Sequence, residues 1–270
     1  MKPENKNIKS LGILYSCYHQ KSREGEQFVP EHVLIYQIAG SLILNDANKE
    51  YEAEEGSFYF IKRNQLLKFK KQPPVNGEFK SLSIYLNQET LKNFSMEYRV
   101  SYEKNQQDPD PVFHLKTNRF LKAYVNSLLE YHLNNISNNQ QLLEVKLKEG
   151  LILLLETNPE LKNFLFDFNE PHKINLEAFM NKNYHFNVHL ERFAYLTGRS
   201  LATFKRDFEK IFHTTPRRWL QQKRLKEAYY LIKEKGKMAT EIYHDLGFED
   251  LSHFSYAFKK TFGESPSKIS

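Results

Sequence analysis

"FAYLTGRSLATFKRDFEKIFHTTP" (193–216) and "IYHDLGFEDLSHFSYAFKKTFGESP" (242–266) are two copies of one pattern. In each copy a short apolar segment precedes a glycine, Gly198 or Gly247, which predicts a sharp turn between two helices. In each second helix, phenylalanines at i, i+4 and i+8 fall on one stripe that a core can bury. These are Phe204, Phe208 and Phe212 in the first copy, and Phe254, Phe258 and Phe262 in the second. The pattern predicts a duplicated helix-turn-helix.

The residues around the repeat predict further helices. Pro216 is well placed to start a long basic helix between the copies, because proline suits the first helical turn. Asn187 is a plausible N-cap for the first helix of copy one. The chain before this region contains Pro171, which breaks the helical pattern. We therefore expect a linker at 167–173 and a helical domain at 174–270, with helix-turn-helix motifs at about 188–212 and 238–262 and a linking helix at about 216–235.

The front of the chain has a different pattern. Between about residues 10 and 86, short β-rich runs alternate with turn-forming residues, which predicts an antiparallel sandwich or small barrel. Leucines at helical spacing then predict helices at 113–133 and 141–157, with 158–168 as a possible third. The expected fold class is α+β in two domains, with a sensor or dimerisation domain at 1–166.

The charge of the chain is uneven. The last hundred residues contain 18 of the 39 Lys and Arg and 11 of the 33 Asp and Glu, a formal charge of +7, which leaves −1 for the first 170. A basic domain of this kind favours a polyanionic partner. Cys17 is the one cysteine, and "MKPENKNIKS" at the start has no apolar core of a signal peptide, so we expect a cytoplasmic protein.

The sequence offers little for catalysis or metal binding. The β region contains only His19 and His32, whereas a metal-binding site needs several ligands at set spacing. A paired nucleophile and base, a glycine-rich phosphate loop and a CxxC motif are also missing from the sequence. We therefore expect no catalytic residues, no metal and no cofactor.

The last hundred residues resemble the DNA-binding domain of AraC/XylS-type bacterial transcription regulators. The resemblance covers about residues 173–268. It rests on Gly247-Phe248, Ser252, Phe254, Phe258-Lys259-Lys260, Phe262-Gly263 and Ser265-Pro266, with Arg224-Leu225, Ala228 and Leu231 on the linking helix. It implies that one chain reads two successive major-groove segments of DNA, about 34 Å apart.

The resemblance also assigns roles to individual residues. Arg206 is the strongest single expectation, because its planar fork can bond a guanine edge bidentately. The residues expected to read bases are Ala202, Lys205 and Arg206 in the first copy and Leu251, Ser252, His253 and Tyr256 in the second. Those expected to contact phosphate are Arg199, Ser200, Thr203, Arg217, Lys259 and Lys260. Trp219 and Phe248 are interpreted as core residues.

Two positions depart from the family pattern. Tyr243 replaces a small residue on the first helix of copy two, which puts groove reading by that copy in doubt. His213 replaces a glycine at the end of copy one, and histidine tolerates positive φ better than most residues.

The resemblance implies partners as well. The front domain is similar to the cupin-like sensor halves of this family, and in particular to the ExsA-type sensor domain. The expected partners are promoter DNA, RNA polymerase, a small-molecule or protein effector of unknown identity, and a second copy of the chain bound through the helices at 113–157. Those helices can equally serve only to cover the sheet.

We expect a DNA-binding transcription activator. Two alternatives remain open at this point: a small-molecule receptor with an incidental basic tail, and a cupin-type enzyme with an appended helical domain.

Overall fold

The computed structural model describes residues 6–10, 12–23, 27–101, 110–133 and 139–269. Parts of the predicted ranges 1–166 and 113–157 fall in the gaps and lie outside the described residues. The chain forms two compact units. The first comprises residues 1–25 and 29–169, and the second comprises residues 26–28 and 170–270.

The first unit is built on an antiparallel sheet in the order β1-β2-β10-β4-β7-β11. Its strands are β1 (Lys6–Ser10), β2 (Ile13–Tyr18), β10 (Phe79–Leu86), β4 (His32–Ala39), β7 (Phe58–Ile61) and β11 (Val112–His114). Both edge strands, β1 and β11, reach beyond the predicted range of 10–86, which is therefore too short. The edge strand β11 pairs with β7 across a large sequence separation, which local patterns do not reveal.

Smaller sheets complete the β structure. One has the order β6-β5-β9 and the other pairs β3 with β8. Their strands are β5 (Ser41–Asn45), β6 (Glu50–Ala53), β9 (Lys68–Gln72), β3 (Phe28–Val29) and β8 (Gln65–Leu66). An apolar cluster joins the two larger sheets, with Leu42, Leu44 and Ala53 from one and Ile35 and Ile61 from the other.

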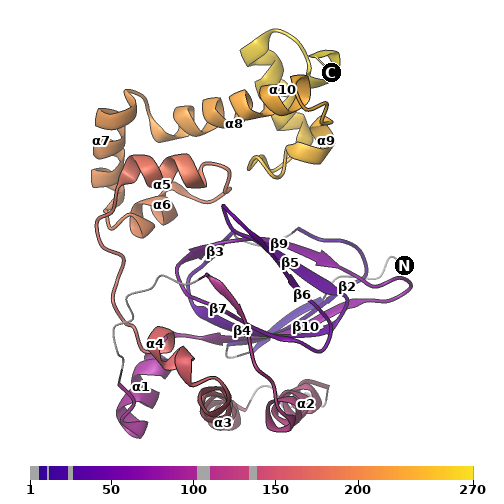
Figure 1. Cartoon of the computed structure of the whole chain (residues 1–270), viewed down its shortest axis with the longest axis vertical. Helices are drawn as coiled ribbons and strands as arrows, with labels where there is room; N and C mark the ends of the chain where they lie inside the picture. The colour runs from indigo at the N-terminus through magenta and orange to yellow at the C-terminus, as the bar shows by residue number, and fades with distance from the viewer. Residues whose placement is uncertain (1–5, 11, 24–26, 102–109, 134–138, 270) are drawn as a thin grey trace. The chain divides into compact units, whose positions relative to one another are not determined.

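Helices cover the opposite face of the six-stranded sheet (Figure 1). They are α1 (Gln88–Tyr98), α2 (Arg119–Leu133), α3 (Gln140–Thr157) and the short η2 (Pro159–Leu161) and α4 (Lys162–Leu165). Leu121 and Leu128 of α2 and Leu151 of α3 pack in one cluster with Phe58 and Phe60 of the sheet. Strand residues alternate between the two clusters because successive side chains point to opposite faces. The first unit therefore has three layers, and covering the sheet is one established role of these helices.

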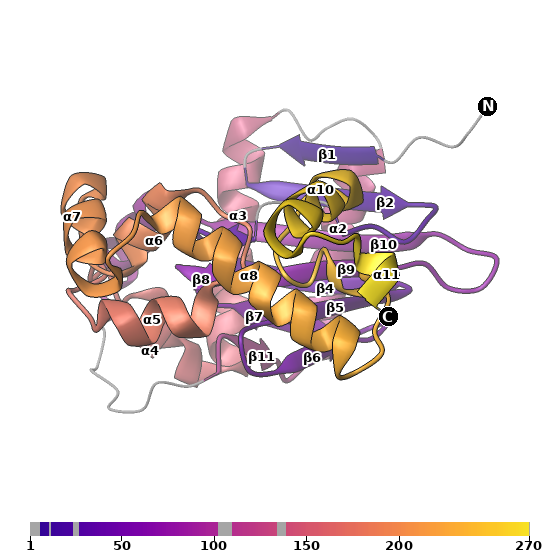
Figure 2. The same cartoon turned by 90° about the horizontal axis from the view of Figure 1, so that it is seen from above.

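From residue 170 to 269 the regular structure of the second unit is helical. Its helices are α5 (Leu176–Asn183), α6 (Leu190–Leu196), α7 (Leu201–Phe212), α8 (Pro216–Lys233), α9 (Ala239–Ile242), α10 (Leu251–Phe262) and α11 (Pro266–Ile269). Figure 2 shows α8 running from the group of α5, α6 and α7 to the group of α10 and α11. The N-cap of α6 is His189, so the prediction of Asn187 as its cap is wrong. The expected two-domain α+β fold is confirmed.

The predicted linker at 167–173 is divided between the units. Arg63 of the first unit donates to the carbonyl oxygens of Asp167 and Asn169 at 3.1 and 2.6 Å. Farther along the chain, the Tyr195 hydroxyl of the second unit donates to Glu170 at 2.5 Å. These bonds assign each part of the segment to its own unit.

Candidate nucleic-acid interface

The two copies of the repeat have the same turn. In copy one, the N–H groups of Gly198 and Arg199 donate to the carbonyls of Tyr195 and Ala194 at 2.9 and 3.0 Å. In copy two, the equivalent N–H groups of Gly247 and Phe248 donate to His244 and Tyr243, both at 3.0 Å. Both glycines have positive φ, +64° and +82°. The turn before α10 therefore keeps the same hydrogen bonds in copy two, where Tyr243 is present.

The second helices of the two copies, α7 and α10, also begin and end alike. Ser200 caps α7 by accepting from the Thr203 N–H, and Asp250 caps α10 by accepting from the His253 N–H. Both helices span 12 residues and end in a left-handed residue. That residue is Gly263 in α10 and His213, with φ +53°, in α7. The expectation that histidine can end this helix is confirmed.

The phenylalanine stripes anchor both helices in cores. Phe204 and Phe208 of α7 and Phe254 and Phe258 of α10 are fully buried. Trp219 packs on Phe208 with 5.6 Å between ring centroids, and Phe248 is buried beside Phe254. The interpretation of Phe248 as a core residue is confirmed, whereas Trp219 is only half-buried and packs at the edge of the phenylalanine stripe. With one stripe of each helix held inward, the opposite faces lie in solvent.

The predicted reading residues lie on these outer faces. Arg206 of α7 is 66% exposed at its side chain and Tyr256 of α10 is 67% exposed. Leu251 differs, because it is half-buried and packs against the core of copy two. The remaining members of the set are all exposed: Ala202, Lys205, Ser252 and His253.

A hollow of about 440 Å³ lies between the two copies, and we call it the inter-repeat hollow. Its walls include Lys205 from α7, Arg217 from α8 and His253 from α10, which are three of the residues predicted to meet DNA. The carboxylates of Glu191 and Glu249 also line it. The fold thus brings predicted contacts from both copies and from the linking helix to the border of one concave surface.

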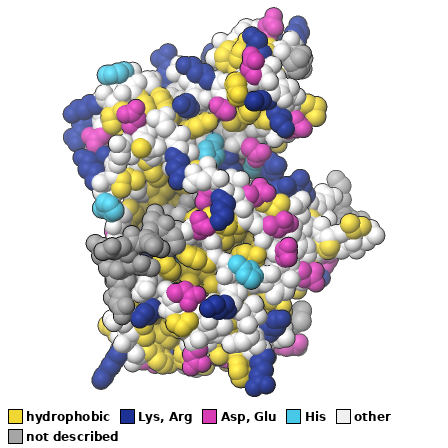
Figure 3. Space-filling model, viewed as in Figure 1, with side chains coloured by type: hydrophobic (Ala, Val, Ile, Leu, Met, Phe, Trp, Pro, Cys, Tyr) yellow, Lys and Arg dark blue, Asp and Glu magenta, His cyan; other side chains and the backbone are white. Residues whose placement is uncertain are grey.

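Basic side chains are prominent near this surface. Figure 3 shows Lys and Arg over α7 and α8 on the face it displays. Arg217, Lys259 and Lys260 are exposed, so their charges are available to a polyanion. Ser200 and Thr203 are joined by a hydrogen bond of 3.0 Å between their hydroxyl oxygens at the start of α7.

Arg199 is a correction to the sequence analysis. Its side chain is only 7% exposed and its Nε donates to Asp207 at 3.1 Å. Its Nη1 donates to the carbonyls of Thr197 and Ile174 at 2.7 and 3.1 Å. The prediction that Arg199 contacts phosphate is wrong, because this guanidinium is already used to hold α7 against the start of the second unit.

Comparison of the two copies of the repeat could have predicted that Arg199 is buried. At the position equivalent to Arg199, copy two has Phe248, and at the position equivalent to Asp207 it has Ala257. Both Phe248 and Ala257 are buried in the core of copy two. Copy one therefore has an ion pair at two positions where copy two has apolar core residues.

This equivalence predicts the outcome of a swap. Arg199→Phe alone should destabilise the second unit because Asp207 loses its partner, and Asp207→Ala alone should do so because a buried guanidinium remains. The double variant has the residue pair of the second repeat. Its loss of unfolding free energy should be smaller than the sum of the losses in the two single variants. Denaturation followed by the fluorescence of Trp219, the one tryptophan, measures this. Strictly additive losses would contradict the equivalence.

The ion pair also has a pH dependence with a definite sign. The hydrogen bond from Arg199 holds the pKa of Asp207 below its usual range. Its contribution to stability is therefore present above about pH 4, the usual value, and is lost as the pH falls through the lower pKa of the folded state.

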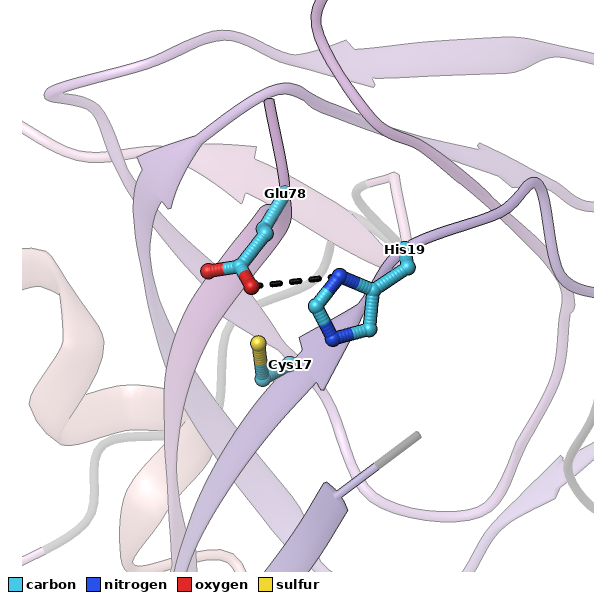
Figure 4. Close-up of side chains that lie close together, drawn as sticks. All are labelled: Cys17, His19 and Glu78. Carbon is cyan, nitrogen blue, oxygen red and sulfur yellow. Dashed lines mark ion pairs between the residues drawn. The ribbon is translucent and has the colours of Figure 1, made fainter. Parts of the chain in front are cut away.

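A cluster that sequence analysis missed lies in the first unit (Figure 4). The ligand atoms of Cys17, His19 and Glu78 all lie within 4.8 Å of one another, with His19 Nδ1 3.1 Å from Glu78 Oε1. Lys80 binds the other carboxylate oxygen at 2.6 Å, and this bond lowers the pKa of Glu78. A metal ion would face the fixed charge of Lys80, so the donors fit a hydrogen-bonded cluster better than a cation site.

His32, the other histidine considered as a metal ligand, lies outside this cluster and is buried. Its ring stacks on Phe60 with 5.3 Å between centroids, and its Nδ1 accepts from the Arg63 N–H. Burial lowers the pKa of His32 to about 3, so the ring is neutral at physiological pH.

Comparisons with known proteins agree with this arrangement. The family profile "ExsA N-terminal regulatory domain" matches residues 32–166, and the profile "Helix-turn-helix domain" matches residues 193–270. The HTH-type transcriptional regulator ExsA of Pseudomonas aeruginosa is 23% identical over 268 residues, which cover 96% of this chain and 94% of ExsA. The virulence regulon transcriptional activator VirF of Yersinia enterocolitica is 26% identical over 86% of each chain.

A crystal structure of an apo variant of ToxT from Vibrio cholerae aligns with 95% of this chain and 96% of its own, at 14% identity and a TM-score of 0.48. The chain belongs to the ExsA-type family of AraC transcription regulators. It is a helix-turn-helix transcription regulator with an N-terminal regulatory domain, as the sequence predicted. Among the helices that the structure describes, none is both long and apolar enough to cross a membrane.

Proposed function

We propose that this chain activates transcription by binding double-stranded promoter DNA with α7 and α10 in two successive major-groove segments. The observation that carries the proposal is the matched pair of helices, each with one stripe buried and its polar face exposed, bordering the inter-repeat hollow. A major groove admits a helix whose N-terminal residues meet the base edges. In this proposal Arg206 and Lys205 read bases in one segment, and Ser252, His253 and Tyr256 read them in the next.

Phosphate contacts would fix the chain in register on the duplex. Arg217, Lys259 and Lys260 are the exposed cations proposed for this role, while Ser200 and Thr203 offer hydroxyl groups beside the start of α7. Because Arg199 is buried, the proposed phosphate contacts include one cation fewer than the sequence predicted.

The expected result is salt-dependent binding to duplexes that the full-length chain enriches from a randomised library. Each neutralised phosphate adds about 0.9 to the slope of log affinity against log salt, so three cations predict a slope of about −3. Fluorescence anisotropy at several salt concentrations measures it. Binding that is weak, indifferent to sequence and insensitive to salt would contradict the proposed function.

The role as an activator implies RNA polymerase as a further partner. VirF is described as a transcriptional activator, and its similarity to this chain covers both units. We therefore favour a regulator over the alternatives of a small-molecule receptor with an incidental tail or a cupin-type enzyme. Transcription from an enriched duplex placed upstream of a weak promoter, with purified RNA polymerase, distinguishes activation from repression.

We also propose that two copies associate through α3. Although Leu143, Leu147, Leu151 and Leu154 of this helix are buried, Val145 is 62% exposed and Ile152 is 37% exposed. These two residues are seven positions apart and therefore lie on one outer stripe of the helix. Dimerisation would let two binding sites act together through effective concentration.

The prediction is that Val145→Asp combined with Ile152→Asp shifts the chain to a monomer, because two charges would be desolvated at the interface. Sedimentation equilibrium measures the state. Met96→Asp, which alters a 72% exposed apolar residue of α1, is the control and should leave the state unchanged. A monomeric wild-type chain at all accessible concentrations would contradict this part of the proposal.

The regulatory unit would receive the effector in a hollow of about 740 Å³ beside α1 and α3. Four carboxylates line it, and Lys148 of α3 binds Glu97 of α1 at 2.6 Å. The carboxylates are those of Glu31, Glu89, Glu97 and Glu144. This charge favours a protein with a basic segment or a cationic small molecule as the effector.

A further inference from the structure

Arg224 lies near the middle of α8 and joins the segment between α5 and α6 to the second copy of the repeat. Its Nε donates to the carbonyl of Tyr184 at 2.7 Å, and its Nη2 donates to the carbonyl of Phe186 at 2.8 Å. Both carbonyls belong to the segment between α5 and α6. Its Nη1 donates to the carbonyl of Gly247, in the turn of copy two, at 2.8 Å. One guanidinium therefore ties the segment that leads into copy one to the turn of copy two.

The environment of this guanidinium makes the loss of any of its three hydrogen bonds costly. Arg224 is half-buried, and burial lowers its pKa to about 10, so the group is partly desolvated but still charged at neutral pH. A buried charge is costly unless its hydrogen bonds are made. All three acceptors are main-chain oxygens, whose positions follow the backbone directly. Moving copy two relative to the segment between α5 and α6 would break charge-assisted hydrogen bonds.

Gly247 allows copy two to approach the segment between α5 and α6 closely. A Cβ placed on Gly247 would lie 2.7 Å from the carbonyl oxygen of His185 and 2.9 Å from Arg224 Cζ. The equivalent Gly198 in copy one instead lies against the main chain of His172 and Lys173. The glycine of copy two thus makes room for the segment between α5 and α6 and for Arg224, in addition to forming its turn.

We infer that Arg224 is a positioning residue that fixes the separation of α7 and α10 and thereby sets the DNA spacing that the chain accepts. This inference rests on the proposed function. Adding one base pair between two segments moves them apart by about 3.4 Å and also rotates them about the duplex axis. Two helices held by a rigid joint cannot follow that change, whereas helices on a loosened joint can.

The test uses the duplex that the full-length wild-type chain enriches from a randomised library, and two relatives of it with one base pair inserted or deleted between its two half-segments. Arg224→Lys keeps a cation but loses the three-way fork. Gly247→Ala displaces a partner of the fork without changing charge. Lys226→Met, which removes an exposed cation from the same helix, is the control.

Wild type and Lys226→Met should lose about tenfold or more in affinity when the spacing changes by one base pair. In Arg224→Lys and Gly247→Ala this ratio should fall toward one, while binding to an isolated first half-segment stays close to wild type. A merely structural role would lower affinity for all three duplexes equally, and that result would overturn the inference. Unchanged spacing ratios in both variants would overturn it as well.

The two proposals fail in different ways. If the wild-type chain enriches no duplex and shows no salt-dependent binding, the proposed function is wrong. If wild type binds and discriminates spacing but the Arg224 and Gly247 variants discriminate equally well, the positioning role alone is wrong.

Discussion

Replacing Gly198 by alanine is expected to lower the free energy of unfolding of the second unit by about 2–5 kcal/mol. About 1–2 kcal/mol of this comes from placing a side chain at a positive φ, here +64°. About 1–3 kcal/mol more comes from steric overlap. The new Cβ would lie 2.3 Å from the carbonyl carbon of His172 and 2.5 Å from the Lys173 nitrogen, and both are backbone atoms that cannot turn away.

Gly236→Ala is the matched control for this prediction. Gly236 has a φ of +62°, but a Cβ there meets nothing within 4 Å. It should therefore lose only the conformational contribution of about 1–2 kcal/mol. Because Trp219 lies in the second unit, chemical denaturation followed by its fluorescence reports on that unit in the full-length chain. Equal losses in the two variants would show that the segment at 172–173 moves aside without cost.

Arg206→Ala should weaken binding to the enriched duplex by about 1–3 kcal/mol, or about 5- to 150-fold, and remove the preference at one base position. The Arg206 side chain is 66% exposed, and its ion pair with Asp207 is long, 3.8 Å from Nε, because Asp207 is held more closely by Arg199 at 3.1 Å. A lost bidentate contact to a guanine edge would affect one base pair rather than the whole site.

Lys210→Ala separates that base contact from simple loss of charge. Lys210 is exposed in the last turn of the same helix and carries the same charge. Its replacement should reduce affinity modestly and equally for all sequences. Anisotropy titrations against the enriched duplex and its single-position variants measure both effects. If the two variants weaken binding alike and leave every base preference intact, the assignment of Arg206 to base reading is wrong.

The helical unit could be predicted from sequence because its signals are local and repeated. Three phenylalanines at i, i+4 and i+8 require one buried stripe, and a glycine before them requires a turn, so the burial of Phe204 and Phe254 followed directly. The same reasoning placed Arg206 and Tyr256 on the outside, because they lie opposite the stripe.

The features that sequence analysis missed depend on partners brought from elsewhere in the chain. Arg199 resembles an exposed cation until folding places it beside the carbonyl of Ile174 and the carboxylate of Asp207. The Cys17 and Glu78 side chains meet because β2 pairs with β10 in a register that pairs Cys17 with Lys80. The register of a sheet depends on long-range packing, which short sequence patterns do not encode.

The three acceptors around Arg224 are all main-chain carbonyl oxygens, and this determines which of the residues involved can be substituted without losing the hydrogen bonds. Every amino acid presents a carbonyl, so substitutions at Tyr184 and Phe186 that preserve the backbone path would leave the bonds to the guanidinium in place. The demand on residue type falls on Arg224, which supplies the fork, and on Gly247, which leaves room for it. If α7 and α10 read DNA as proposed, their exposed faces can diversify while Arg224 and Gly247 preserve the bonds that hold the second copy in place.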